Sequence, residues 1–175
     1  MQKQYKIYKI DTDKITETLS KIDMYNVIRI DREYIAVEYD YFNRTYGELL
    51  EFMFELPVSQ YIFMASTYYS LLKYLVENSF RVYEIKLNSI FKDENEEIQK
   101  YITLLSTDKK DKILNTLLSD LRWYNYDEGI DICNMSFGIK KDNTFGAVHI
   151  ANNGVVSIDK EKIEDEVFDI LKEIL

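Results

Sequence analysis

The sequence predicts a single α+β domain, built from a mostly antiparallel sheet and about five or six helices. Two observations indicate this class. Short segments with the residue types of strands alternate with longer segments whose apolar residues recur at helical spacing. The chain of 175 residues can form one well-buried core, and its five glycines and single proline, Pro57, leave little room for linkers between domains.

The first 40 residues predict a strand, a helix and a hairpin, in that order. YKIYKI at 5–10 alternates weakly, as strands do, and the helix after it has three apolar residues at helical spacing: Ile15, Leu19 and Ile22. NVIRIDREYIAVEY at 26–39 predicts the hairpin. With a turn at Arg32 and Glu33, the pairs on one face would all be apolar: Ile28 with Val37, and Ile30 with Ile35.

A second helix and a further strand complete the N-terminal third. Thr45 and Glu48 have the capping-box spacing, in which two side chains satisfy the first free backbone donors of a helix. The buried side of that helix is marked by Leu49, Leu50 and Met53. Residues 60–65 predict a short buried strand. The resulting β-α-β-β-α-β order is that of a ferredoxin-like unit, so the sequence leaves open a subunit of this kind over residues 1–65.

The middle of the chain predicts three helices and one strand. Ser66 is the expected N-cap of the first helix, residues 80–87 predict the strand, and Asp93 with Glu96 forms a second capping-box pattern. The apolar positions of the three helices recur at helical spacing: Tyr68, Leu71, Leu72 and Leu75; then Ile98, Tyr101, Ile102 and Leu105; then Ile113, Leu114, Leu117, Leu118 and Leu121.

Residues 130–175 predict a C-terminal β-β-β-α unit. Its first two strands are joined by a loop at 141–144, and its second pair by a three-residue loop with Gly154 in the left-handed conformation. A two-residue turn at Asn153-Gly154 is the alternative, but it separates apolar from polar residues less cleanly. The preferred register pairs apolar residues on one face: Met135 with Ile150, Phe137 with Val148, Ile150 with Val156, and Val148 with Ile158. The opposite face then carries a row of Ser136, His149 and Ser157.

Composition and charge argue against several classes of function. The chain carries 22 basic and 31 acidic residues, and a net charge of −9 argues against direct binding of a nucleic-acid backbone. Its single cysteine, Cys133, permits neither an intramolecular disulfide nor a thiolate metal cluster within one chain. No segment approaches the roughly 18 apolar residues of a membrane span, and the N-terminal segment lacks a secretory apolar core. We therefore expect a soluble, cytoplasmic protein with no membrane partner.

No sequence motif for a nucleotide, a cofactor or a metal is present. The chain lacks a Walker loop, a dinucleotide-binding fingerprint, a Cys-x-x-Cys pair and a His-Glu-x-x-His helix. We therefore expect no cofactor and no metal site. The loop DEGID at 127–131, with three carboxylates, is an alternative site for Ca²⁺ or Mg²⁺, but it lacks the spacing of an EF-hand loop.

His149, the only histidine, allows two interpretations. In a row with Ser136 and Ser157 it could serve nucleophilic catalysis or hold a small molecule, with Cys133 as a further polar contact. However, the sequence has no Gly-x-Ser-x-Gly turn, and small polar residues are typical of any solvated sheet face. A structural or surface role is therefore the preferred interpretation.

Acidic residues recur every four positions along the last predicted helix, at Glu161, Asp165, Asp169 and Glu173. Like charges at this spacing destabilise a helix by about 0.2–0.5 kcal/mol per pair. An ordinary solvated helix face is one interpretation. The other is an acidic ladder that binds a basic surface of a partner, where complementary charge speeds association and selects the partner.

Two aromatic residues, Tyr41 and Phe42, follow a predicted strand end, where Tyr39 should face the core with Val37. Their rings either anchor a partner or fold back onto the core.

The leading hypothesis is a small acidic, non-enzymatic inhibitor of the phage counter-defence or toxin-immunity type. It would act in the cytoplasm, that of the host if phage-encoded, by occupying a basic surface of a partner protein, such as one that normally holds nucleic acid. The alternative is a small-molecule-binding protein or enzyme that uses the sheet face around His149. A homo-oligomer that buries the aromatic surface between subunits is a third hypothesis.

Overall fold

The structure, a computed structural model, describes residues 2–40, 45–89, 92–105, 107 and 110–175. Within these residues the chain forms eight β-strands, six α-helices and two 3₁₀ turns. In chain order they are β1 (Lys3–Ile10), η1 (Thr12–Lys14), α1 (Ile15–Lys21), β2 (Val27–Arg29), β3 (Tyr34–Tyr39), α2 (Tyr46–Phe54), β4 (Val58–Gln60), α3 (Ala65–Glu77), β5 (Arg81–Leu87), α4 (Lys92–Leu104), α5 (Lys110–Tyr126), β6 (Ile132–Lys141), β7 (Thr144–Ala151), β8 (Val155–Ile158), η2 (Glu161–Ile163) and α6 (Glu164–Ile174).

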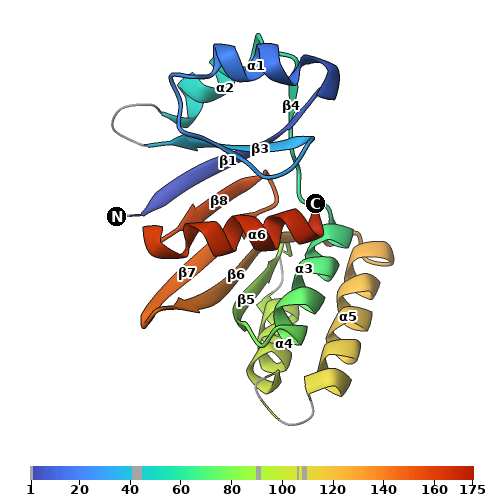
Figure 1. Ribbon diagram of the computed structural model, residues 1–175. Helices are drawn as coiled ribbons and strands as arrows, with labels where there is room; N and C mark the ends of the chain where they lie inside the picture. Colours follow the sequence, from blue (N-terminus) through green and yellow to red (C-terminus); the bar gives the residue numbers. More distant parts are fainter. Residues whose placement is uncertain (1, 41–44, 90–91, 106, 108–109) are drawn as a thin grey trace.

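The eight strands of the described residues form one sheet in which each pair is antiparallel (Figure 1). The strand order is β2-β3-β1-β8-β7-β6-β5. β8 pairs with the first half of β1, and β4 pairs with the last three residues of the same edge. The predicted α+β class with a mostly antiparallel sheet is confirmed.

The first 65 residues place their four strands in the order β2-β3-β1-β4, and α1 and α2 lie together beside this part of the sheet (Figure 1). Tyr8 and Ile10 of β1 contribute to a hydrophobic cluster on the side of these helices, which also contains Leu49 and Met53 of α2. Because β1 also pairs with β8, this part is continuous with the rest of the sheet. A ferredoxin-like subunit that folds independently over residues 1–65 stays a prediction.

The predicted register of the first hairpin is wrong by one residue. Val37 pairs with Val27 instead of Ile28, and Ile35 pairs with Arg29 instead of Ile30. The physical reason lies in the loop. The carboxylate of Asp31 accepts hydrogen bonds from the backbone N–H groups of residues 33 and 34, at 2.7 and 2.8 Å, which favours a longer loop over a two-residue turn.

One of the three predicted N-caps is confirmed. Thr45 accepts a hydrogen bond from the backbone of Glu48, whose carboxylate accepts one from the backbone of Thr45, as in a capping box. Ser66 is not a cap, because α3 begins at Ala65 and Ser66 lies within its first turn. The N-cap is Met64, which makes no side-chain cap hydrogen bond. Asp93 is not a cap either, because α4 begins at Lys92 and Asp93 lies within its first turn.

The strand predicted over 60–65 is displaced. β4 ends at Gln60, and the segment after it is extended without continuing the ladder. The backbone N–H of Tyr61 donates to the carbonyl of Ile7 at 3.0 Å, whereas that of Phe63 donates to the carbonyl of Asn152 at 2.8 Å. The segment therefore bridges β1 and the β7–β8 turn before α3 begins.

The C-terminal β-β-β-α unit has the predicted register. Met135 pairs with Ile150 and Phe137 with Val148 across β6 and β7, and β7 pairs with β8 as predicted. At the β6–β7 turn Asp142 and Asn143 both have positive φ, 44° and 62°, as a type I′ turn requires. At the β7–β8 turn Gly154 has φ 81°, also as predicted.

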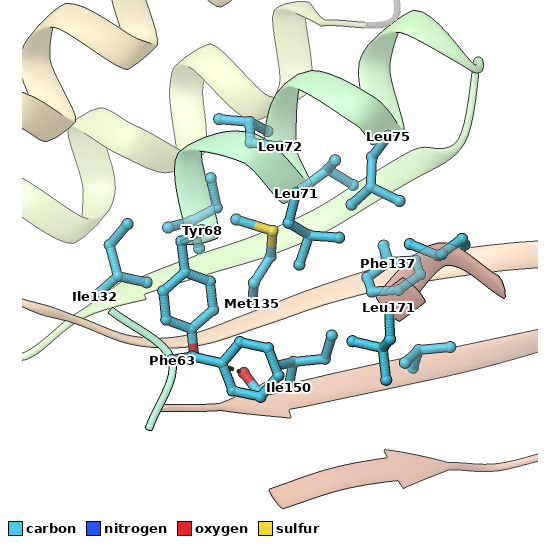
Figure 2. Close-up of a cluster of buried hydrophobic side chains, with 14 of the residues drawn as sticks. Phe63, Tyr68, Leu71, Leu72, Leu75, Ile132, Met135, Phe137, Ile150 and Leu171 are labelled. Atoms are coloured by element: carbon cyan, nitrogen blue, oxygen red, sulfur yellow. Dashed lines mark hydrogen bonds between the residues drawn. The ribbon is translucent and has the colours of Figure 1, made fainter. Parts of the chain in front are cut away.

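The larger hydrophobic cluster lies between the sheet and the helices α3 to α6. Figure 2 shows its centre, where Met135 and Phe137 of β6 and Ile150 of β7 meet side chains of α3 and Leu171 of α6. The hydroxyl of Tyr68 in α3 donates to the carbonyl of Ile150 at 3.1 Å, so this buried polar atom is satisfied. Among the described residues, no helix has both the length and the apolar character needed to cross a membrane.

Candidate functional site

The first candidate site is a polar row on the sheet face that α3 and α6 do not cover. Its centre is the predicted Ser136, His149 and Ser157, which pair directly across β6, β7 and β8. The hydroxyl of buried Ser136 lies 2.7 Å from Nδ1 of exposed His149. This alternation arises because their sequence neighbours, among them Val148 and Ile150, point into the core on the opposite face.

The row is longer than the sequence indicates. Glu84 of β5 pairs with Ser136 at one end, and Gln4 of β1 pairs with Ser157 at the other. The amide of Gln4 donates to the hydroxyl of Ser157 at 3.4 Å, a long hydrogen bond. The row therefore crosses five strands. No local pattern points to Glu84 or Gln4, because their membership depends on strand pairings between distant parts of the chain.

The chemistry of the row favours hydrogen bonding over nucleophilic catalysis. A catalytic serine needs a base that is oriented by a third group and a nearby oxyanion hole. Within the described residues no third group orients the imidazole of His149, because its one side-chain hydrogen-bond partner is Ser136. Cys133, which lies three residues before Ser136 in the sequence, is half-buried. It is a weak nucleophile, because burial raises the pKa of its thiol. The row can hold a polar ligand, and it lacks the assembled groups of a hydrolase.

The second candidate site is the outer face of the C-terminal helix, with the predicted Glu161, Asp165, Asp169 and Glu173. All four side chains are exposed. Glu161, however, lies in the 3₁₀ turn η2 that precedes α6, so it is not on the same α-helix as the other three. The spacing of the acidic ladder is therefore helical only from Asp165 onward.

Two of the four carboxylates each lie near a lysine that is shared with a second carboxylate. Glu161 forms an ion pair with Lys3 at 2.9 Å, and this hydrogen bond lowers the pKa of Glu161. Asp165 lies 4.0 Å from the ammonium of Lys141, which also pairs with Glu166 at 2.6 Å. The sequence does not indicate these two lysines as partners, because both belong to distant strands.

The remaining two carboxylates, Asp169 and Glu173, form no ion pair with any described residue. They stand on the solvent side of α6, whose inner side is buried through Val167, Ile170 and Leu171. The acidic surface available to a partner is therefore centred on Asp169 and Glu173.

α6 is held firmly against β1. The hydroxyl of Tyr5 donates to one oxygen of Glu164 at 2.6 Å, and the ammonium of Lys3 pairs with the other at 2.8 Å. The pKa of Tyr5 is raised, first by burial and then by its hydrogen bond to Glu164. The rings of Tyr5 and Phe168 meet edge to face with 5.1 Å between centroids. These contacts fix the orientation in which the outer face is presented.

The other predicted sites receive less support. Tyr41 and Phe42 lie outside the described residues, whereas Tyr39 and Val37 are buried in one cluster, as predicted. In the DEGID loop, Asp131 accepts a hydrogen bond from Asn125 at 2.7 Å. Over the part of the chain that the structure describes, the loop does not bring three carboxylates into a group that could hold a metal ion.

Comparison with protein-family models, with curated proteins and with solved structures found no match to this chain.

Proposed function

We propose that this chain is a small acidic, non-enzymatic binding protein that occupies a basic surface of a partner protein. An inhibitor of the counter-defence or toxin-immunity type would have this function. The observation that carries the proposal is the pair of exposed carboxylates on α6, Asp169 and Glu173, which no described cation neutralises. A helix with a buried inner side and a fixed orientation presents them on an ordered backbone, so binding needs to order only their side chains.

The charge of the whole chain supports the same function. A net charge of −9 attracts a basic partner at long range and accelerates association, and this effect weakens as salt is added. A partner whose basic surface normally holds nucleic acid would be bound in competition with that nucleic acid, because both ligands present negative charge at short intervals.

The test is capture of partners from a lysate of the source organism at low and at high salt. The variant Asp169→Lys/Glu173→Lys reverses the charge of the two side chains at the proposed contact surface. The variant Glu51→Lys/Glu55→Lys is the matched control, because it changes the same total charge at two exposed acidic positions four residues apart, at α2 and its C-cap. Circular dichroism must show that both variants fold.

The proposal predicts a partner that wild type and control retain, that higher salt weakens, and that the α6 variant loses. Equal capture by both variants would contradict it, and so would a partner whose retention is insensitive to salt.

A second candidate function is binding of a small polar ligand on the sheet face. It rests on the 2.7 Å hydrogen bond between Ser136 and His149, which pre-orients the imidazole. A thermal-shift screen against wild type and His149→Ala tests it. A ligand that stabilises the wild type and not the variant would support this function, and equal shifts in both would exclude His149 from the site.

A further inference from the structure

A partly open cavity of about 520 Å³ is lined by residues from the middle of the chain, from Val76 to Lys110, away from the acidic face of α6. It is bordered by the turn between α3 and β5, the start of β5, the second half of α4 and the start of α5. In Figure 1 these elements are grouped beside the β5 edge of the sheet. Its volume falls in the range of about 300–1,000 Å³ that is typical of small-molecule sites.

One side of the cavity is apolar. Val76 at the end of α3, Val82 of β5 and Ile102 of α4 are buried residues that line it, and the half-buried Phe80 and Leu105 extend the surface. Such a wall binds the hydrocarbon part of a ligand by removing apolar surface from water.

Part of the backbone of β5, the strand beside the cavity, is satisfied before any ligand binds. β5 is an edge strand of the sheet, and side chains of α4 form hydrogen bonds with two of its backbone groups. The amide of Gln99 donates to the carbonyl of Tyr83 at 2.8 Å, and the side-chain oxygen of Asn95 accepts from the N–H of Leu87 at 2.8 Å. The cavity is therefore unsuited to an added β-strand, which would need these edge groups.

The charged residues of the lining are both basic. Arg81 comes from β5 and Lys110 from the first turn of α5, and among the residues that the structure describes no acidic one lines the cavity. The guanidinium of Arg81 lies 5.6 Å from the centre of the Tyr83 ring, a cation–π contact that restrains it at the cavity. Neither cation forms an ion pair with a described residue, although the chain has 31 acidic residues against 22 basic ones.

We propose that this cavity binds an organic anion with an apolar body, such as a carboxylate or phosphate monoester carried on an aromatic or branched hydrocarbon. Arg81 and Lys110 neutralise the anionic group, and the wall around Val82 and Ile102 holds the hydrocarbon. This site is independent of the acidic face of α6, so either proposal can fail without the other.

The test uses two fluorescent probes that differ in charge. 1-Anilinonaphthalene-8-sulfonate carries an anionic group on an aromatic body, and N-phenyl-1-naphthylamine has the same rings without the charge. We expect saturable binding of the sulfonate at one site per chain. The variants Arg81→Gln and Lys110→Gln should each weaken it by about tenfold, the loss expected for one hydrogen bond to a charged group, and leave binding of the neutral probe unchanged.

Matched controls are available on the same two elements. Lys86→Gln removes an exposed cation from the other end of β5, and Lys112→Gln removes one from α5 two residues beyond Lys110; neither residue lines the cavity. Both controls should bind the sulfonate as the wild type does. An independent variant, Thr103→Trp, fills the cavity from an exposed lining position and should abolish binding of both probes while the thermal unfolding midpoint stays close to that of the wild type.

The headgroup is then identified by displacement. Release of the bound sulfonate by decanoate marks a carboxylate site and release by phenyl phosphate marks a phosphate site, provided that decanol, which lacks the charge, needs a higher concentration for the same release. The proposal is overturned by any of three results: no saturable binding to the folded protein, equal affinity in Arg81→Gln, Lys110→Gln and the two controls, or undiminished binding in Thr103→Trp.

Discussion

Lys6 shows how strongly a single residue of this fold depends on its surroundings. Its side chain is fully buried, and its ammonium donates to the backbone carbonyls of Asn153 and, at 3.4 Å, Tyr61. No described carboxylate pairs with it. Desolvation therefore lowers the pKa of Lys6 to about 8, because the charged form loses its hydration without gaining a counter-ion. Folding at neutral pH carries the cost of this buried charge.

The lowered pKa of Lys6 makes the stability of the folded protein depend on pH. Between pH 8 and 10.5 the folded protein releases the proton of Lys6 while the unfolded chain still holds it, so the free energy of unfolding rises with pH in this window. We expect a gain on the order of 1 kcal/mol between pH 7.5 and 9.5 that the variant Lys6→Met lacks. Urea unfolding of both proteins at these pH values measures it. Parallel pH profiles for the two proteins would disprove the lowered pKa.

Glu164 is, in contrast to Lys6, a largely buried charged group that has a partner of opposite charge. It accepts from the hydroxyl of Tyr5 and pairs with Lys3, whose side chain is only 15% exposed. Glu164→Gln removes the charge and leaves Lys3 without its buried counter-ion, so we expect a loss of about 1–3 kcal/mol in the free energy of unfolding.

The control for that variant is Glu161→Gln, because Glu161 pairs with the same lysine from a position that is 74% exposed. Chemical denaturation should show a clearly smaller loss for the control, since water screens an exposed pair. Losses of equal size would mean that burial does not set the strength of this pair.

At the scale of elements, the two hairpins show what the sequence can predict. In β6–β8 the turn residues and the alternation agree, because Asp142, Asn143 and Gly154 are types that tolerate the positive φ of tight turns. In β2–β3 no glycine or asparagine marks a two-residue turn, and the one turn-favouring residue, Asp31, sets a longer loop by accepting hydrogen bonds from the backbone of residues 33 and 34.

The same distinction separates the predictable from the unpredictable part of the candidate sites. The Ser136-His149-Ser157 row follows from two local hairpins, so a register argument finds it. The pairing of Lys3 with Glu164 joins residues 161 positions apart, and Lys141 reaches α6 from the end of β6. Only tertiary packing creates such contacts, which is why the four-residue acidic ladder contains fewer unpaired carboxylates than its spacing predicts.

The type I′ turn between β6 and β7 offers a test at this scale. Asn143 occupies its second central position with φ 62°, a conformation that glycine adopts without a steric cost. Asn143→Gly should therefore raise the free energy of unfolding by a few tenths to about 1 kcal/mol, and Asn143→Val should lower it. The midpoints of urea unfolding give both values. A stabilised valine variant would show that the turn has another conformation.

At the scale of the whole molecule, the β7–β8 turn connects the C-terminal strands to the N-terminal third of the chain. Gly154 accepts a backbone hydrogen bond from Ile7 at 2.9 Å, and Asn152 accepts one from Phe63 at 2.8 Å. Together with the pairing of β1 and β8, these contacts make residues 1–65 and the C-terminal strands parts of one sheet. We therefore expect a single cooperative unfolding transition. Trp123, the only tryptophan, reports on α5, whereas far-ultraviolet circular dichroism reports on all helices, so the two signals should change together.

Gly154→Ala tests this coupling directly. The residue has φ 81°, and an added Cβ would collide with the carbonyl oxygen of Tyr61, so the turn must move away from the N-terminal part. We expect a loss of about 2–4 kcal/mol that shifts the fluorescence and dichroism transitions equally. Gly129→Ala is the control, because φ is similar at 68° but no atom lies within 4 Å of the new Cβ, and its loss should be limited to the backbone strain of about 1 kcal/mol. If Gly154→Ala instead separates the transitions, with Trp123 reporting an unchanged midpoint, residues 1–65 unfold as a subunit of their own and the single-domain interpretation is wrong.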